Sequence, residues 1–253
     1  DDGSIEPLVV NGLIDEVWTL SDFHTSYITN CDHTGIRRNF EMLKKAIWQT
    51  RNGVNDYGRI SDTPRDHNHF VFNAAYTKGM RVLLEKVWPR LRMRIKGARL
   101  TIVGGYYSFP GDKLEKQGED VRIWQEKMKA RPDLNVTFTG SVKQETVADI
   151  LKTAGFMLYP TEYPETFGIS TLEALFYRTP VITANFGALE ETAIDMACYK
   201  LPYSTTPNVL FPKIDEEWQV NKFVDAAVAA YENTYLYMQK QNYCDVIKDV
   251  ATW

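Results

Sequence analysis

The feature that most constrains the fold of this 253-residue chain is a regular alternation of short apolar runs with longer helix-forming segments between residues 69 and 183. The apolar runs are continuous, which is typical of strands buried on both faces of a parallel sheet. The predicted strands are residues 69–73, 100–103, 136–138, 156–159 and 181–183, and the predicted helices are residues 80–93, 121–130 and 144–154. Because strands and helices follow one another in succession, the sequence predicts an α/β fold: a doubly wound parallel sheet within residues 57–253.

Further elements are predicted on both sides of this alternation. Residues 17–20 are predicted as a short buried strand, and residues 23–28 and 36–46 as helices. Residues 223–233 and 235–250 are predicted as two helices at the C-terminus.

A pair of glutamates stands at the junction between one predicted strand and the next helix. Glu165 lies in the loop after the strand at residues 156–159, and Glu173 follows eight positions later in a helix-forming Leu-Glu-Ala-Leu. Gly168 frees the backbone just before that helix. Backbone N–H groups and the dipole at the start of a helix favour a bound phosphate, and open α/β sheets bind ligands at the carboxyl ends of strands. The context predicts a sugar-nucleotide site.

The same residues also fit a purely structural pattern. Ser170 and Glu173 have the spacing of a capping box, in which Ser170 accepts from the Glu173 N–H and the Glu173 carboxylate reaches back to the Ser170 N–H. A carboxylate engaged in a cap is less free for a ligand. From the residues alone, the capping and ligand-binding interpretations are evenly matched.

Composition and charge exclude several function classes. The net charge of −4 argues against a nucleic-acid partner or an anionic membrane surface, because neither phosphate-rich partner would be neutralised. No apolar run reaches the roughly 18 residues needed to span a bilayer, and the N-terminal Asp-Asp-Gly-Ser lacks signal-peptide character. We expect no transmembrane segment and a cytoplasmic location.

The cysteines and histidines do not predict a metal centre. Cys31, Cys198 and Cys244 are far apart and form no Cys-x-x-Cys pair, so we expect reduced thiols and neither a disulfide framework nor a zinc site. His67 and His69 are predicted to lie in a polar turn rather than to bind a metal. We expect no metal and no cofactor.

Several short motifs occur in a fixed order along the chain. They are the Asp15–His24 stretch with Ser21, Asn52-Gly53-Val54, Lys78-Gly79, Gly104-Gly105, Gly140-Ser141-Val142, the Glu165 to Glu173 segment, and Gly187 to Glu191. Singly most are weak, but in this order the chain resembles the retaining nucleotide-sugar glycosyltransferases of the GT-B architecture, the Glu-x7-Glu group. The resemblance runs along nearly the whole chain. It implies that residues 57–253 form the Rossmann-like donor-binding domain and that residues 1–56 are a remnant of the N-terminal acceptor domain.

The resemblance also implies roles for individual residues. Glu165 would hold hydroxyls of the donor sugar, Glu173 would accept from the ribose hydroxyls, and Lys78 would neutralise the leaving diphosphate. The distal phosphate would lie against backbone N–H groups, and the nucleobase would meet backbone atoms of the loop after the strand at residues 136–138. The phosphate-binding N–H groups would be those of Gly168, Ile169, Ser170 and Thr171, and the residues beside the base would be Ser141 and Val142. Neither glutamate is assigned a proton-transfer role.

The sequence departs from the family pattern in two places. The arginine that the family commonly places after the strand preceding Lys78 is replaced by Ala74-Ala75, so Lys78 would act alone or with Arg81. The turn after Glu191 also lacks the glycine usually found there, which bears on the lip of the sugar pocket.

The resemblance implies a transferase with a nucleotide sugar donor and a glycan, lipid or protein acceptor. Because so few residues precede the predicted donor domain, we expect the chain to be a fragment that binds the donor and transfers poorly by itself. The alternatives are a GT-B epimerase or phosphorylase and a noncatalytic interaction module with the same fold.

Overall fold

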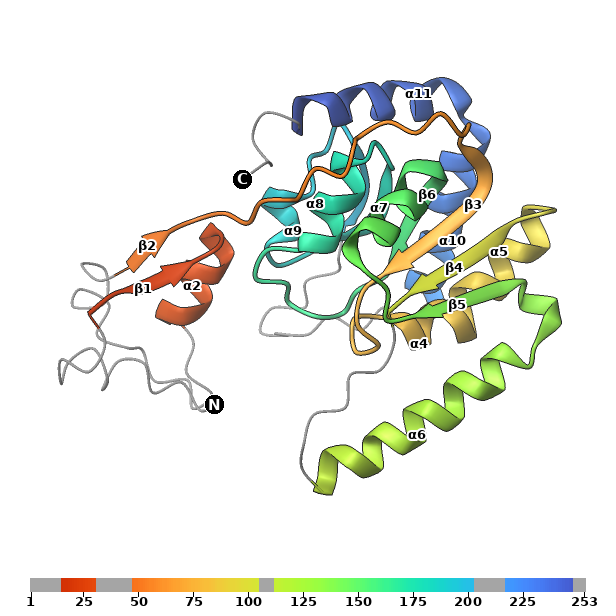
Figure 1. The fold of residues 1–253 in the computed structure, drawn as a ribbon, viewed down its shortest axis with the longest axis horizontal. Helices are drawn as coiled ribbons and strands as arrows, with labels where there is room; N and C mark the ends of the chain where they lie inside the picture. Colours follow the sequence, from red (N-terminus) through yellow and green to blue (C-terminus); the bar gives the residue numbers. More distant parts are fainter. Residues whose placement is uncertain (1–14, 31–46, 105–111, 203–216, 248–253) are drawn as a thin grey trace.

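The computed structural model describes residues 15–30, 47–104, 112–202 and 217–247, and within them a six-stranded sheet forms the core (Figure 1). All strand pairings in this sheet are parallel, in the order β5-β4-β3-β6-β7-β8. The strands are β3 (Asp66–Asn73), β4 (Arg99–Val103), β5 (Val136–Gly140), β6 (Ala154–Tyr159), β7 (Val181–Asn185) and β8 (Cys198–Pro202). The predicted doubly wound parallel sheet is confirmed.

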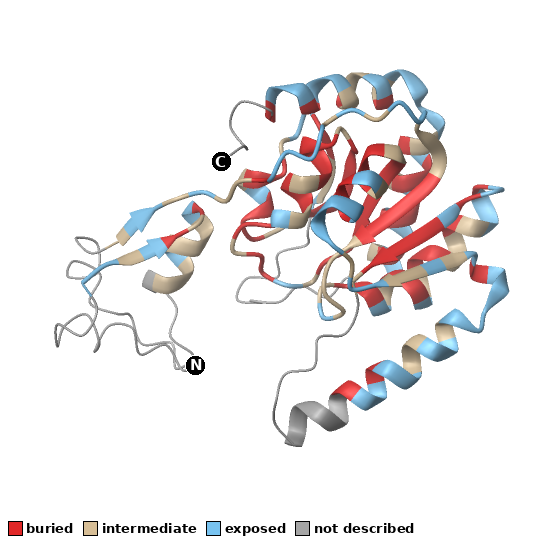
Figure 2. Cartoon of the chain, viewed as in Figure 1, coloured by how far each residue is buried: buried red, intermediate tan, exposed pale blue. Residues whose placement is uncertain are grey.

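Helices lie on both faces of the sheet. One group comprises α4 (Met80–Val82), the π turn η1 (Leu83–Val87), α5 (Trp88–Arg94) and α10 (Glu217–Glu232), and within it α10 contacts η1, α5, β7 and β8. The other group comprises α7 (Gln144–Thr153), α8 (Ile169–Phe176) and α9 (Leu189–Thr192). The remaining described elements are α6 (Asp112–Lys129), η2 (Pro132–Leu134), α11 (Thr234–Tyr243) and η3 (Cys244–Ile247). Figure 2 shows the buried residues concentrated in the central strands and the helix faces turned toward them.

The strand order creates a switch point in the middle of the sheet. From β3 the chain moves outward through β4 to β5, and from β6 it moves outward in the other direction through β7 to β8. The neighbouring strands β3 and β6 therefore send their following segments to opposite sides. A crevice outside the carboxyl ends of two such strands is where open α/β sheets bind ligands.

Several element boundaries differ from the prediction. The single helix expected at residues 80–93 contains the π turn η1, which comes just before Pro89. A proline in a helix has no N–H to donate and crowds the preceding turn, which favours such an irregularity. The helix expected at residues 235–250 gives way to a 3-10 turn at Cys244, whereas the Asn233 side chain caps its start by accepting from the Leu236 N–H at 2.9 Å. Strand β8 was not predicted.

The polar turn predicted around His67 is wrong, because β3 begins at Asp66 and includes both histidines, whereas the strand predicted from His69 onward is confirmed. His67 packs its ring against Phe156, Tyr231 and Tyr237, and His69 is buried with Nε2 2.8 Å from the Thr101 hydroxyl. Cross-strand and aromatic packing thus extends the strand beyond its apolar half.

The buried position of His69 predicts a pH-dependent stability. Burial lowers the pKa of His69 to about 4, so the unfolded chain binds the proton between pH 4 and the ordinary value of 6.5 while the folded chain does not. Stability should therefore rise with pH across this window, by roughly 2 kcal/mol between pH 5 and 7. Urea unfolding at both pH values measures the difference, and the His69→Phe variant should lose most of it. An unchanged pH dependence in that variant would assign the effect to other groups.

A second, two-stranded sheet is formed by β1 (Val17–Thr19) and β2 (Ile47–Gln49), with α2 (Asp22–Asn30) beside it (Figure 1). The strand predicted at residues 17–20 and the helix predicted at residues 23–28 are confirmed, but the expected burial of the strand is wrong, because Trp18 is 63% exposed. The helix predicted at residues 36–46 lies outside the described residues. The division into domains at residue 56 stays a prediction.

Candidate functional site

The two loops that leave the switch point meet at an ion pair between Lys78 and Glu165. Lys78 follows β3 and Glu165 follows β6, and the Lys78 Nζ lies 2.9 Å from both Glu165 carboxylate oxygens. The Glu165 side chain is 4% exposed. Tyr159, the last residue of β6, donates its hydroxyl proton to Glu165 Oε1. The carboxylate is thus held from two sides at the carboxyl edge of the sheet.

Two glycines permit these loops to approach so closely. Gly79 has a φ of 94°, and a Cβ on it would lie 2.1 Å from the Pro160 carbonyl oxygen. Gly187 lies directly against the Glu165 backbone, because a Cβ added to it would lie 3.2 Å from the Glu165 backbone N and O. The Ala188 N–H donates to the Glu165 carbonyl at 2.9 Å. The Lys78-Gly79 and Gly187 motifs therefore have a steric cause.

Glu173 lies on α8 in a separate part of the site. Asn73, the last residue of β3, donates its side-chain amide to Glu173 Oε2 at 3.0 Å, and Oε1 has no hydrogen-bond donor among the described residues. Burial raises the pKa of Glu173, and the Asn73 hydrogen bond opposes that shift. Glu173 lines a pocket of about 530 Å³ whose other walls come from the chain before β3, from α7 and from α8. The lining residues are Gly53, Val54, Asn55, Tyr57, Gln144, Val147, Ala148, Ile169, Glu173 and Tyr177.

The start of α8 rules out the capping box. The N-cap residue is Gly168, with a φ of 82° and no side-chain cap, so Ser170 is already inside the helix. The Glu173 carboxylate is bonded to Asn73 instead of the Ser170 N–H. A positive φ at Gly168 starts the helix earlier than the Ser-x-x-Glu spacing implies.

The first N–H groups of α8 divide into engaged and free ones. The Thr171 N–H, which was predicted to bind phosphate, donates to the Gly168 carbonyl at 2.9 Å. The buried Thr171 hydroxyl has no partner among the described residues. The N–H groups of Gly168, Ile169 and Ser170 have no acceptor within the described part of the chain. Three N–H groups at a helix start are suited to an anion.

Three further predicted site residues are Arg81, Ser141 and Val142. Arg81 is exposed and pairs with Glu85 at 3.0 Å, and Glu85 also accepts from the Trp124 indole, so the arginine is directed toward its own helix. Ser141 and Val142 lie in the loop between β5 and α7, and the pocket is lined by the nearby Gln144.

Residue-by-residue reasoning missed Asn73 and Tyr159 as partners of the glutamates. Both are last residues of strands, so their position at the carboxyl edge was predictable, but the direction of each side chain was not. Glu191 was identified as part of the Gly187 to Glu191 motif, but its partners were not predicted: its carboxylate accepts from the N–H groups of Asp22 (3.1 Å) and Phe23 (2.9 Å) at the start of α2. Ser21 donates to the Thr166 carbonyl at 2.6 Å, so the segment before β3 contacts the loop that carries Glu165.

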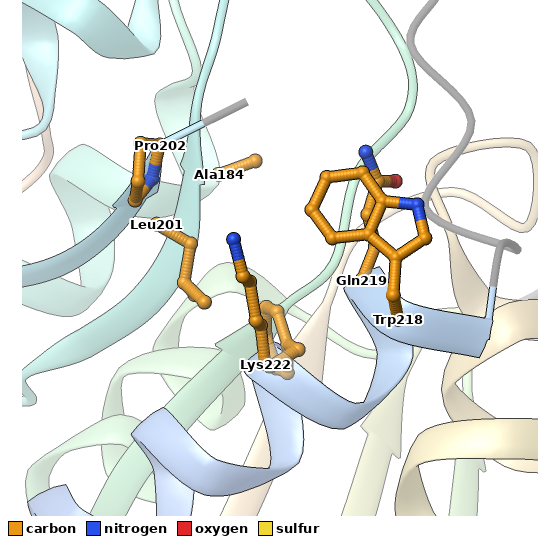
Figure 3. Close-up of a pocket in the computed structure, with 7 residues that line it drawn as sticks. Ala184, Leu201, Pro202, Trp218, Gln219 and Lys222 are labelled. Atoms are coloured by element: carbon orange, nitrogen blue, oxygen red, sulfur yellow. The ribbon is translucent and has the colours of Figure 1, made fainter. Parts of the chain in front are cut away.

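A second pocket, of about 310 Å³, lies between the ends of β7 and β8 and the start of α10 (Figure 3). Its walls are mostly apolar, with Leu201, Trp218 and Phe223 among them, and Lys222 stacks on the Trp218 ring at 4.7 Å. None of the predicted site residues lines it.

The described residues contain no group of three or more His, Cys, Asp or Glu side chains placed to hold a metal ion. None of their helices is long and apolar enough to cross a membrane.

Two curated proteins resemble part of the chain. It is 30% identical over 111 residues to the alpha-1,3/1,6-mannosyltransferase ALG2 of Candida albicans. The aligned region covers 40% of this chain and 25% of that protein. It is 31% identical over 91 residues to ALG2 of Debaryomyces hansenii, over 34% of this chain and 18% of that protein. The match thus spans a quarter or less of these relatives.

Solved structures share the fold at low sequence identity. The pneumococcal O-GlcNAc transferase GtfA, in complex with UDP and GlcNAc, superposes with a TM-score of 0.67 at 13% identity, over 98% of this chain and 44% of that chain. Anabaena HepE in complex with UDP and glucose gives 0.67 at 14% identity, over 99% and 65%. The predicted GT-B type of fold is thereby confirmed.

The family match covers more of the chain than the match to either curated relative. Residues 68–231 match the model of the family described as "Glycosyl transferases group 1", which is well over half of the chain and includes Lys78, Glu165 and Glu173. The chain belongs to the group 1 glycosyl transferases.

Proposed function

We propose that the chain binds a nucleotide diphosphate sugar and is the donor-binding part of an enzyme that transfers the sugar with retention of configuration. The observation that carries the proposal is the joint placement of two carboxylates around one helix start. Glu165 is paired with Lys78 on one side, and Glu173 lines a pocket of about 530 Å³ on the other. The free N–H groups of Gly168, Ile169 and Ser170 belong to the same helix start.

Each part suits one portion of the donor. The free Oε1 of Glu173 accepts from ribose hydroxyls, and carboxylate acceptors form strong hydrogen bonds of this kind. The helix start and Lys78 receive the diphosphate, and Glu165 receives hydroxyls of the sugar. The solved structures of GtfA and HepE were obtained with UDP, which supports a nucleotide in this fold.

Catalysis in this proposal is electrostatic. As the bond between sugar and diphosphate breaks, negative charge grows on the leaving phosphate, and the Lys78 ammonium stabilises that charge more in the transition state than in the ground state. Neither glutamate transfers a proton. Donor binding is proposed to need no metal, because Lys78 and the helix N–H groups supply the positive potential.

The acceptor is proposed to be a glycan, a lipid or a protein, and the chain alone is proposed to transfer poorly. An epimerase or phosphorylase would use the same donor site, and radiolabel from the donor sugar appearing on an acceptor separates transfer from both.

Calorimetric titration tests the binding step. UDP, GDP and ADP, and sugars linked to each, are added to millimolar concentration with and without EDTA. We expect one nucleoside diphosphate to bind, equally well in EDTA. Absence of binding to all three at millimolar ligand would contradict the proposed function, and loss of binding in EDTA would contradict its metal independence.

A further inference from the structure

Lys78 has a second neighbour in addition to Glu165. Its Nζ lies 5.3 Å from the centroid of the Tyr163 ring, within the range of a cation–π contact. Lys78 is thus placed between a buried carboxylate and an aromatic ring that is itself 44% exposed. The ring belongs to the same loop as Glu165.

The loop that carries Tyr163 is restrained at several points. Pro160 and Pro164 fix the backbone φ on either side, and the Tyr163 N–H donates to the Thr161 hydroxyl at 3.1 Å. The backbone of Pro160 also abuts Gly79, the residue next to Lys78. The ring and the lysine are therefore held by two loops in direct contact.

The two neighbours act differently on the ammonium group. Glu165 neutralises the lysine charge, and in the proposed function this carboxylate turns to the donor sugar. An aromatic face attracts a cation through its quadrupole and leaves its positive charge available to a phosphate. A ring that stays on the lysine keeps its long, flexible side chain in place when the carboxylate is engaged elsewhere.

Other cations that could share the diphosphate charge with Lys78 are replaced or engaged elsewhere. Ala74 and Ala75 replace the arginine that the family commonly places there, and Arg81 is paired with Glu85. Lys78 is thus left as the side-chain cation that contacts Glu165.

We propose that Tyr163 is a positioning residue that holds the Lys78 ammonium in place for the donor diphosphate. The inference rests on the proposed function. The Tyr163 ring should therefore strengthen binding of the nucleoside diphosphate, through its phosphates, and leave binding of the nucleoside unchanged.

Two variants and two ligands test this role. Tyr163→Leu removes the ring, and Tyr163→Phe keeps it without the hydroxyl. Each variant is titrated with the nucleoside diphosphate, among UDP, GDP and ADP, that binds the unaltered chain, and with the corresponding nucleoside. Tyr163→Leu should weaken the diphosphate roughly fivefold, as expected for a partly exposed cation–π contact. Tyr163→Phe should stay within about twofold of the unaltered chain, and nucleoside binding should be the same in all three proteins.

The outcomes separate this role from the donor site itself. If the unaltered chain binds none of the three diphosphates, the proposed function and the role of Tyr163 both fail. If it binds one and Tyr163→Leu binds equally well, only the role of Tyr163 fails. Equal weakening of nucleoside and diphosphate, or a loss in Tyr163→Phe as large as in Tyr163→Leu, would also overturn the role, because a general structural effect would then explain it.

Discussion

Replacing Gly79 with alanine should destabilise the fold by about 3 kcal/mol and abolish measurable nucleoside diphosphate binding. The added Cβ would lie 2.1 Å from the Pro160 carbonyl oxygen and 3.3 Å from the Thr161 Cα, and both neighbours are backbone atoms. The φ of 94° adds strain for any residue with a side chain. The loops of Lys78 and Glu165 must therefore separate, which breaks the ion pair.

Gly97 provides the matched control for this substitution. It has a φ of 84°, but a Cβ on it would meet nothing within 4 Å. Gly97→Ala should therefore cost about 1 kcal/mol, from backbone strain alone, and leave nucleotide affinity unchanged. Urea unfolding and titration of both variants make the comparison. Equal costs at the two positions would show that the close approach at Gly79 is not essential.

Truncating Lys78 should also have a large effect, because it leaves a buried carboxylate without its cation. In Lys78→Met, the Tyr159 hydroxyl would be the one side chain within the described residues that still donates a hydrogen bond to Glu165. Loss of one partner of a buried pair costs 3–5 kcal/mol, and we expect about 2 kcal/mol here because the Lys78 side chain is 30% exposed. Adding Glu165→Gln should restore more than half of the loss, because no uncompensated charge remains.

An exposed pair serves as the reference for Lys78. Lys129 lies 2.7 Å from Glu126, with side chains 45% and 57% exposed. Lys129→Met should change the free energy of unfolding by less than about 0.5 kcal/mol. If Lys78→Met changed the free energy of unfolding as little, or if adding Glu165→Gln restored none of the loss, the Lys78–Glu165 pair would not stabilise the fold as expected.

The fold could be predicted where local signals and burial agree. The Phe-Met-Leu-Tyr run of β6 is fully buried, and Gly168 begins α8, so strand, loop and helix were all anticipated. Strand β2 was missed because it is only three residues long, and strand β8 was missed because it is an edge strand that includes Lys200 and Pro202. Edge strands of this kind carry little hydrophobic signal.

The site could be predicted only in part, for a different reason. The order of motifs placed Lys78, Glu165 and Glu173 near one another, and the structure brings Lys78 and Glu165 into contact. The order of motifs does not show which side chains donate hydrogen bonds to each carboxylate, so Asn73 and Tyr159 were not predicted as these donors. The order likewise could not show that the Thr171 N–H donates to the Gly168 carbonyl within the turn.

Glu173 is proposed to hold the ribose of a nucleotide donor, and the most direct test compares binding of a nucleoside diphosphate with binding of its 2′-deoxy analogue. We use the one of UDP, GDP and ADP that binds, with the unaltered chain and Glu173→Ala. The unaltered chain should prefer the ribonucleotide by about tenfold, as expected for a hydrogen bond to a charged group. Glu173→Ala should bind both forms weakly and without preference. A preference of equal size in Glu173→Ala, or none in the unaltered chain, would contradict the assignment of Glu173 to the ribose.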